Sequence, residues 1–301
     1  MEVLEEERIV LAAKLNKLKT ISIGVTIILV IGIGFLMDLF WGFLLGAVLG
    51  ITFYTILYHK MIGAYRKNYK LKVFHELVCE LGNKYSYTVD GKIDDGVIRE
   101  SGIFHKFTKV KGEDLIEGTF DTYSFQMAET NLWYYKGRDD DRKFKDSDAG
   151  HATSYIFKGL FFVGKIPLSF PTAIWILSKD HPKVHPISRV QEGWQKVRVD
   201  HSAFRLHYDV YAENKEMASQ ILQPEILDTI IKVKDNVVDP KMRLELSFQK
   251  NNVNISISTL KELFEPPVKT PVTNKEDFKA NFKYLVNTTG LLQQLTLVKS
   301  S

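Results

Sequence analysis

The feature that most constrains this chain is an almost uninterrupted apolar tract at residues 21–58, whose only charged side chain is Asp38. As one straight helix the tract would be about 57 Å long, well beyond the roughly 30 Å hydrocarbon core of a bilayer. Two helices, at 21–37 and 39–58, fit better, with a turn at Asp38. The tract therefore predicts a transmembrane helical hairpin. Because the turn is very short, a shallow or re-entrant hairpin is the alternative.

Basic residues stand at the two ends of the tract but not at its central turn. The positive-inside rule then places both termini, and everything after residue 58, in the cytoplasm. The basic residues directly after the tract also predict contact with anionic lipid headgroups. The basic residues before the tract are Lys14, Lys17 and Lys19. The basic residues predicted to contact the headgroups are Lys60, Arg66, Lys67 and Lys70.

Glycines recur every four residues on the second span, at Gly42, Gly46 and Gly50. They share one helix face and let another helix approach closely, because lipid gives apolar helices no hydrophobic drive to associate. One interpretation is that this face seats the second span against the first. The other is that it forms the seam of a homo-oligomer.

Composition bounds the classes of partner. The net charge of the 301-residue chain is +4, and much of the excess lies beside the apolar tract. Without an arginine-rich run or a basic-aromatic alternation, nucleic-acid binding is not predicted. The single cysteine, Cys79, excludes an intramolecular disulfide. The expected organisation is an amphipathic helix at 1–20, the hairpin at 21–58 and a cytoplasmic domain at 59–301.

Amphipathic helices are predicted on both sides of the hairpin. Residues 2–19 carry leucines at helical spacing, and residues 60–83 carry an apolar stripe that ends at Gly82 and Asn83. The first helix is expected either to lie at the membrane interface or to pack on the segment that follows the hairpin.

The rest of the chain predicts an α+β fold with mainly antiparallel strands. β-Branched and aromatic residues favour strands at 115–127, 153–166, 172–177 and 206–211. Alternating apolar residues predict a β-hairpin at 242–258 with its turn at Asn251 and Asn252. An exposed loop is expected at 136–150 and a terminal helix at 275–298.

Five motifs occur in an order that resembles a known family: ESGIF at 100–104, GED at 112–114, FKGLFF at 157–162, FRLHYDVYAENKEMASQILQPEIL at 204–227 and FEP at 264–266. With the N-terminal hairpin, they resemble the bacterial domain-of-unknown-function family numbered 3137. The chain departs from the family at Ala203, because members of the family often carry an acidic residue directly before the phenylalanine that Phe204 matches.

The resemblance implies a bacterial inner-membrane location, but it carries no activity, cofactor or catalytic residue. It implies a LemA-type membrane protein as a candidate partner.

Sequence motifs give no reaction. The phosphate-binding GxxxxGK[ST], HExxH, GxSxG and a strand-linked GxGxxG are all absent. His181 and His185 have a zinc-like spacing, but each precedes a proline, which disfavours a shared helix face and favours an extended loop. Cys79 follows His75 by one helical turn, and a semi-buried structural cysteine is favoured over a thiolate nucleophile.

The acidic pair Glu113 and Asp114 follows Gly112 at a predicted turn. Adjacent side chains point to opposite sides of a strand, so a shared acid-base site is not predicted and a turn or capping role is favoured. Because this trio belongs to the family resemblance, it is the first candidate for a binding contact, followed by Glu100 and Glu129. No catalytic residue, cofactor or metal ligand is predicted.

Three functional hypotheses follow. The leading one is a non-enzymatic membrane-anchored protein whose cytoplasmic domain binds a protein partner or the membrane surface. The second is a membrane-tethered enzyme, hydrolytic in type, with a site near Glu100, Glu113, Asp114 and His105. The third is a homo-oligomeric membrane scaffold seeded by Gly42, Gly46 and Gly50.

Overall fold

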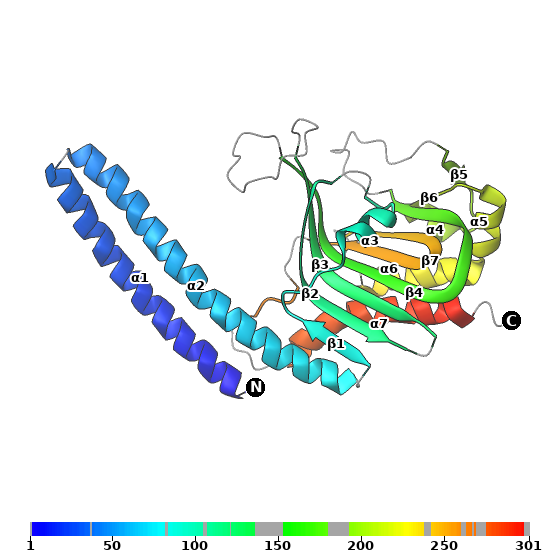
Figure 1. Ribbon diagram of the computed structural model, residues 1–301, viewed down its shortest axis with the longest axis horizontal. Coiled ribbons are helices and arrows are strands. Elements are labelled where there is room, and N and C mark those ends of the chain that lie inside the picture. The colour runs from blue at the N-terminus through cyan, green and yellow to red at the C-terminus, as the bar shows by residue number, and fades with distance from the viewer. Residues whose placement is uncertain are drawn as a thin grey trace. The chain divides into compact units, whose positions relative to one another are not determined.

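The computed structural model describes residues 2–36, 38–81, 84–104, 107–120, 122–135, 153–179, 193–237, 242–259, 263–266, 268 and 275–297. It divides into two compact units. The first combines Met1–Leu77 with Phe264–Lys279, and the second combines Val78–Leu263 with Ala280–Ser301. The predicted α+β class is confirmed, because two long apolar helices are followed by an antiparallel sheet with flanking helices (Figure 1).

The first unit is built on α1 (Glu2–Leu36) and α2 (Leu39–Leu81), which run antiparallel and side by side (Figure 1). Asp38 precedes α2 and caps it: its Oδ1 accepts a hydrogen bond from the Phe40 N–H at 3.2 Å. Its carbonyl accepts one from the Gly42 N–H at 2.8 Å. An aspartate in this position satisfies N–H groups that the first helical turn leaves without partners. The helices therefore break where the apolar tract predicts.

The amphipathic helix expected before the hairpin is part of α1, because no proline or glycine interrupts the chain before Gly24. Leu4, Leu11 and Leu18 are buried and recur every seven residues, as in a coiled-coil seam. Glu7 bonds to α2 nearby. Of the two expected placements, this helix therefore takes the one against the segment that follows the hairpin.

The C-terminal segment of the first unit is tied to both helices. Glu265 lies 2.5 Å from the Arg66 Nε through one carboxylate oxygen and 3.4 Å from the Lys70 Nζ through the other. Arg8 donates to the Val268 carbonyl at 3.4 Å. The FEP motif thus places its carboxylate on two basic residues of α2.

The second unit contains one sheet in which all pairs are antiparallel, in the order β1-β2-β3-β4-β6-β5, with β7 also paired to β4. Its strands are β1 (Tyr85–Thr88), β2 (Lys109–Thr119), β3 (Ser124–Tyr135), β4 (Thr153–Ser178), β5 (Gln195–Val197), β6 (Tyr208–Ala212) and β7 (Leu244–Ser258).

The strand β7 turns back on itself, and β4 curves around it (Figure 1). Lys250 has a φ of 54°, and the Ser258 N–H donates to the Arg243 carbonyl at 2.9 Å. Between these points Asn254 Nδ2 donates to Ser247 Oγ at 3.0 Å. The two halves therefore lie side by side as the predicted hairpin, although the left-handed residue comes one position before the expected asparagines.

Three strand predictions differ from the structure. The single strand expected at 115–127 is β2 and β3, because the chain reverses where the Phe120 N–H donates to the Tyr123 carbonyl at 2.8 Å. The strands expected at 153–166 and 172–177 are one strand, β4, whose register with β7 shifts around its two prolines. The strand expected to start at Leu206 starts at Tyr208, because His201 caps a short helix before it.

Helices cover both faces of the sheet. Ile98 of α3 (Asp95–Glu100) belongs to a buried cluster that includes Val163 of β4. A Cβ on the next residue, Gly164, would meet the side chain of Leu292 on α7 (Lys275–Leu297). Successive strand residues point to opposite faces, so α3 and α7 lie on opposite faces of β4. The remaining helices are α4 (Ser202–His207), α5 (Lys215–Ile221) and α6 (Pro224–Val237).

Candidate functional site

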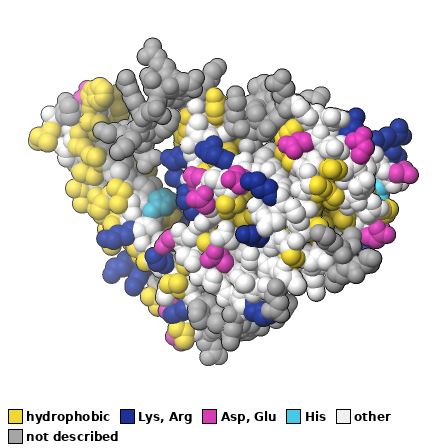
Figure 2. All heavy atoms as spheres, turned by 45° about the vertical axis from the view of Figure 1, so that its right-hand side comes forward, with side chains coloured by type: hydrophobic (Ala, Val, Ile, Leu, Met, Phe, Trp, Pro, Cys, Tyr) yellow, Lys and Arg dark blue, Asp and Glu magenta, His cyan; other side chains and the backbone are white. Residues whose placement is uncertain are grey.

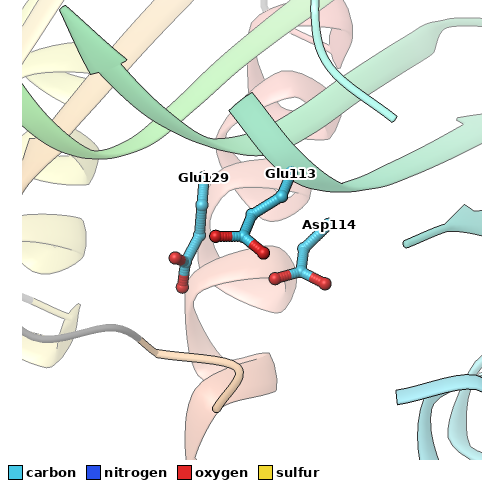
Figure 3. Close-up of side chains that lie close together, drawn as sticks. All are labelled: Glu113, Asp114 and Glu129. Atoms are coloured by element: carbon cyan, nitrogen blue, oxygen red, sulfur yellow. The ribbon is translucent and has the colours of Figure 1, made fainter. Parts of the chain in front are cut away.

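Three carboxylate side chains converge beside the sheet: Glu113 and Asp114 from β2, and Glu129 from β3 (Figure 3). One oxygen from each lies within 4.8 Å of the oxygens of the other two. Glu113 and Glu129 are cross-strand partners in the register of the two strands, so their side chains leave the sheet on the same side. The sequence named these residues as separate candidates and did not predict that they meet.

Asp114 joins the group because β2 is irregular at this point. Its φ is 60°, and the register with β3 shifts between Glu113 and Ile116. Its N–H donates to the Val89 carbonyl at 2.8 Å. A bulge of this kind re-aims a side chain. The expectation that Glu113 and Asp114 point to opposite sides is therefore wrong, because it assumed a regular strand.

Two of the carboxylates are buried: 0% of Asp114 and 7% of Glu129 is exposed. Burial of a carboxylate costs free energy unless the protein supplies donors. The Leu263 N–H donates to Glu129 Oε1 at 2.6 Å, and the Tyr87 hydroxyl on β1 donates to Asp114 Oδ1. The group therefore ties three neighbouring strands and residue 263 together.

The chemistry of this group is that of an oxygen ligand set. Carboxylate oxygens are the ligands that Mg²⁺ and Ca²⁺ prefer in proteins. Asp114 Oδ1 and Glu129 Oε1 accept hydrogen bonds from within the protein, as buried carboxylates ordinarily do. The arrangement supplies ligands without assigning an ion to them.

The other predicted site residues that the structure describes contribute no side chain to this carboxylate group. Glu100 ends α3, and its carboxylate lies 4.0 Å from Lys250 Nζ with most of its side chain exposed. Gly112 pairs with Thr130 across the β2–β3 ladder. The candidates His105, His181 and His185, and the side chain of Cys79, lie outside the described residues.

Residues 155–297 match the model of a family described as Protein of unknown function (DUF3137). The match confirms the predicted resemblance. The motifs at 157–162, 204–227 and 264–266 lie inside the DUF3137 match, whereas those at 100–104 and 112–114 precede it.

No curated protein matches the chain. Among solved structures, the mycobacterial trehalose monomycolate transport factor A, TtfA, is similar at 9% sequence identity and a TM-score of 0.37. The similarity covers 74% of this chain and 91% of that chain. A likeness at this TM-score carries no inference about the present chain.

One polar cluster was not predicted, and it joins the ESGIF motif to the DUF3137 match. The Ser101 carbonyl accepts hydrogen bonds from three side chains: Trp175 Nε1 at 3.3 Å, Ser247 Oγ at 2.6 Å and Gln249 Nε2 at 2.8 Å. Trp175 stacks on Trp194 with ring centroids 3.4 Å apart. In the sequence, only the glycine that follows Ser101 could have pointed to this cluster, because the donor residues are more than seventy positions away.

Replacing Tyr87 with phenylalanine tests the carboxylate group, because it removes the hydroxyl and keeps the ring. We expect the free energy of unfolding to fall by about 1–3 kcal/mol, since buried Asp114 loses a donor. Urea unfolding of the full-length protein in detergent measures the loss. Tyr123→Phe is the matched control, because no hydrogen bond of the Tyr123 hydroxyl is found in the described part of the chain. Equal losses in both variants would contradict a role for the Tyr87 hydroxyl.

The same variant is expected to change how the free energy of unfolding depends on pH in the alkaline range. Burial, reinforced by the neighbouring Asp114 carboxylate, raises the pKa of Tyr87 well above its ordinary value. The folded state therefore keeps a proton that the unfolded state releases above about pH 10, so stability is full below that pH and falls above it. From pH 10 upward the wild type should lose about 1.4 kcal/mol per pH unit more than Tyr87→Phe. Parallel curves would refute this linkage.

Proposed function

We propose that this protein is anchored in a bacterial inner membrane by the α1–α2 hairpin, which crosses the bilayer twice and leaves both termini in the cytoplasm. The observation that carries the proposal is the exposed apolar surface of the hairpin. Its three most exposed large apolar side chains flank the turn: Phe35 at 91%, Leu36 at 81% and Leu39 at 77%. Figure 2 shows hydrophobic side chains gathered over these helices.

Burial separates these helices from the core helices of a soluble protein. Only 11% of the apolar window of α1 and 17% of that of α2 is buried. Apolar area of this extent costs about 25 cal/mol for each Å² exposed to water, and soluble monomers rarely carry such large patches. The hydrocarbon core of a bilayer removes that cost.

The length of the apolar section also fits a bilayer. Residues 21–36 and 39–58 are helical, which corresponds to about 24 Å and 30 Å of helix. The hydrocarbon core is roughly 30 Å thick. Lysines flank the apolar section at the open end of the hairpin, and the only charged residue at the turn is Asp38. This asymmetry supports the cytoplasmic side for the open end.

In this arrangement the sheet unit acts as a cytoplasmic binding module rather than as an enzyme. The support is the absence of the common nucleotide, zinc and serine-hydrolase motifs from the sequence. A protein partner or the membrane surface is the proposed ligand, and a LemA-type membrane protein is the partner that the family resemblance suggests.

Labelling with a membrane-impermeant maleimide tests the topology. In a Cys79→Ser background, single cysteines are placed at Asp38, at the turn, and at Ser301, at the C-terminus. We expect the cysteine at 38 to react in intact cells and the cysteine at 301 to react only after permeabilisation of the inner membrane. Carbonate extraction should leave both variants in the membrane pellet.

Two results would overturn the proposal. Labelling at 301 in intact cells would place the sheet unit outside the cytoplasm. Protection at 38 in intact cells, with labelling after permeabilisation, would show that the hairpin enters the bilayer without crossing it.

A further inference from the structure

The glycines of α2 fix which residues of the two hairpin helices lie at the same level. A Cβ on Gly46 would lie 2.7 Å from the Val30 nitrogen, and a Cβ on Gly50 would lie 2.7 Å from the Thr26 Cβ. Each step of four residues forward on α2 is thus matched by four residues backward on α1. The helices keep a constant antiparallel register along the apolar section.

The same register continues beyond the apolar section. Near the open end, where this register makes Glu7 level with residue 69, Asn68 Nδ2 donates to Glu7 Oε2 at 2.8 Å. Between that hydrogen bond and the glycine contacts, the register places residues 14–19 of α1 level with residues 57–62 of α2. Lysines that are far apart in the sequence therefore occupy one level of the hairpin.

Four lysines occupy this level, and together they are called the basic collar: Lys14, Lys17, Lys19 and Lys60. All four are exposed, and none forms an ion pair with a described residue. Their side chains are long enough to keep the ammonium group in a polar layer while the stem lies along apolar surface. The collar is therefore a band of uncompensated positive charge where the apolar surface ends.

Other basic residues near the hairpin are used inside the protein. Arg66 and Lys70 contact Glu265, and Lys70 is only 2% exposed. Lys72 binds Glu7. Lys67 stands two helical turns beyond Lys60, about 10 Å farther from the apolar section. Of the four residues that the sequence assigned to lipid headgroups, Lys60 alone belongs to the collar.

We propose that the basic collar binds the phosphate groups of anionic phospholipids in the cytoplasmic leaflet. This inference rests on the proposed membrane hairpin and adds its lipid specificity. The collar lies one apolar helix length from the turn, at the depth of the headgroups. The negative surface potential of that leaflet attracts lysines within about a Debye length. Phosphatidylglycerol carries the required single negative charge on its phosphate.

Spin-label EPR of the full-length protein tests the collar. The protein is reconstituted in equimolar phosphatidylcholine and phosphatidylglycerol, and the association constants of the two spin-labelled lipids are compared. We expect wild-type protein to favour phosphatidylglycerol and Lys14→Gln/Lys17→Gln/Lys19→Gln/Lys60→Gln to lose about fivefold or more of that preference. The matched control is Lys111→Gln/Lys165→Gln/Lys215→Gln/Lys232→Gln, which removes the same charge from exposed lysines of the sheet unit and should keep the preference.

The outcomes separate this inference from the proposed topology. Failure of the wild type to enter the bilayer would overturn the hairpin itself. Normal insertion without a preference for phosphatidylglycerol, or a preference that survives in the collar variant, would overturn the collar alone. Displacement of the labelled lipid by free glycerol phosphate would identify a site for small anions and would also overturn lipid binding.

Discussion

Replacing Gly46 with leucine is expected to separate the two hairpin helices. A Cβ at this position would already lie 2.7 Å from the nitrogen and 2.8 Å from the Cα of Val30, and a leucine adds three more carbons. Backbone atoms cannot move aside as a flexible side chain can, so α2 must shift as a whole. Overpacking of this kind costs about 1–3 kcal/mol or more, which corresponds to at least a fivefold change in the population of the closed pair.

Disulfide formation between Ser22→Cys and Tyr54→Cys, in a Cys79→Ser background, reports the closed pair, because the glycine register places these positions level with each other. The cross-linking rate should fall about fivefold or more in Gly46→Leu. Gly24→Leu on α1 is the matched control, because a Cβ there meets no atom within 4 Å. Unchanged cross-linking together with a smaller particle in detergent would instead assign Gly46 to an oligomer seam.

Replacing Gly102 with alanine is expected to destabilise the sheet unit strongly. Its φ is 68°, and a Cβ would lie 2.5 Å from Trp175 Nε1 and 2.9 Å from Gln249 Nε2. Both groups donate to the Ser101 carbonyl. The alanine therefore adds backbone strain of about 1–2 kcal/mol and displaces one buried and one half-buried donor, at about 1–3 kcal/mol each.

Urea unfolding of the full-length protein in detergent should show a loss of about 3 kcal/mol or more for Gly102→Ala. Gly193→Ala isolates the strain, because Gly193 also has a positive φ, 90°, but a Cβ there meets no atom within 4 Å. That control should lose only about 1–2 kcal/mol. If the two variants lost the same amount, the hydrogen bonds to Ser101 would contribute nothing that depends on Gly102.

Local patterns were enough to predict the two long apolar helices, the break between them and the fold class. A continuous apolar tract with one aspartate specifies two helices and their break, since lipid-length helices need only apolar residues and a capped start. Alternating apolar residues likewise specified the turned strand β7. The long strand β4 was divided by its prolines in the prediction, because a proline lacks the N–H that a ladder needs. The structure accommodates both prolines where the register with β7 shifts.

The candidate site could be predicted only in part. Glu113, Asp114 and Glu129 were named, but their meeting depends on a cross-strand register and on the left-handed conformation of Asp114. A local sequence pattern predicts neither the register nor the left-handed conformation, because most residue types favour a regular strand at such a position. The donors to the Ser101 carbonyl come from β4 and β7, and no periodicity within ESGIF points to them.

The boundary between the two compact units crosses the chain three times, at 77–78, 263–264 and 279–280. Neither unit is therefore a continuous stretch of the gene, and no single truncation yields one of them whole. During synthesis the hairpin leaves the ribosome first, whereas Glu265 emerges nearly two hundred residues after its partners Arg66 and Lys70. The first unit is therefore complete only after the C-terminal part of the chain has been made, because its segment from Phe264 to Lys279 is needed to place that carboxylate beside α2.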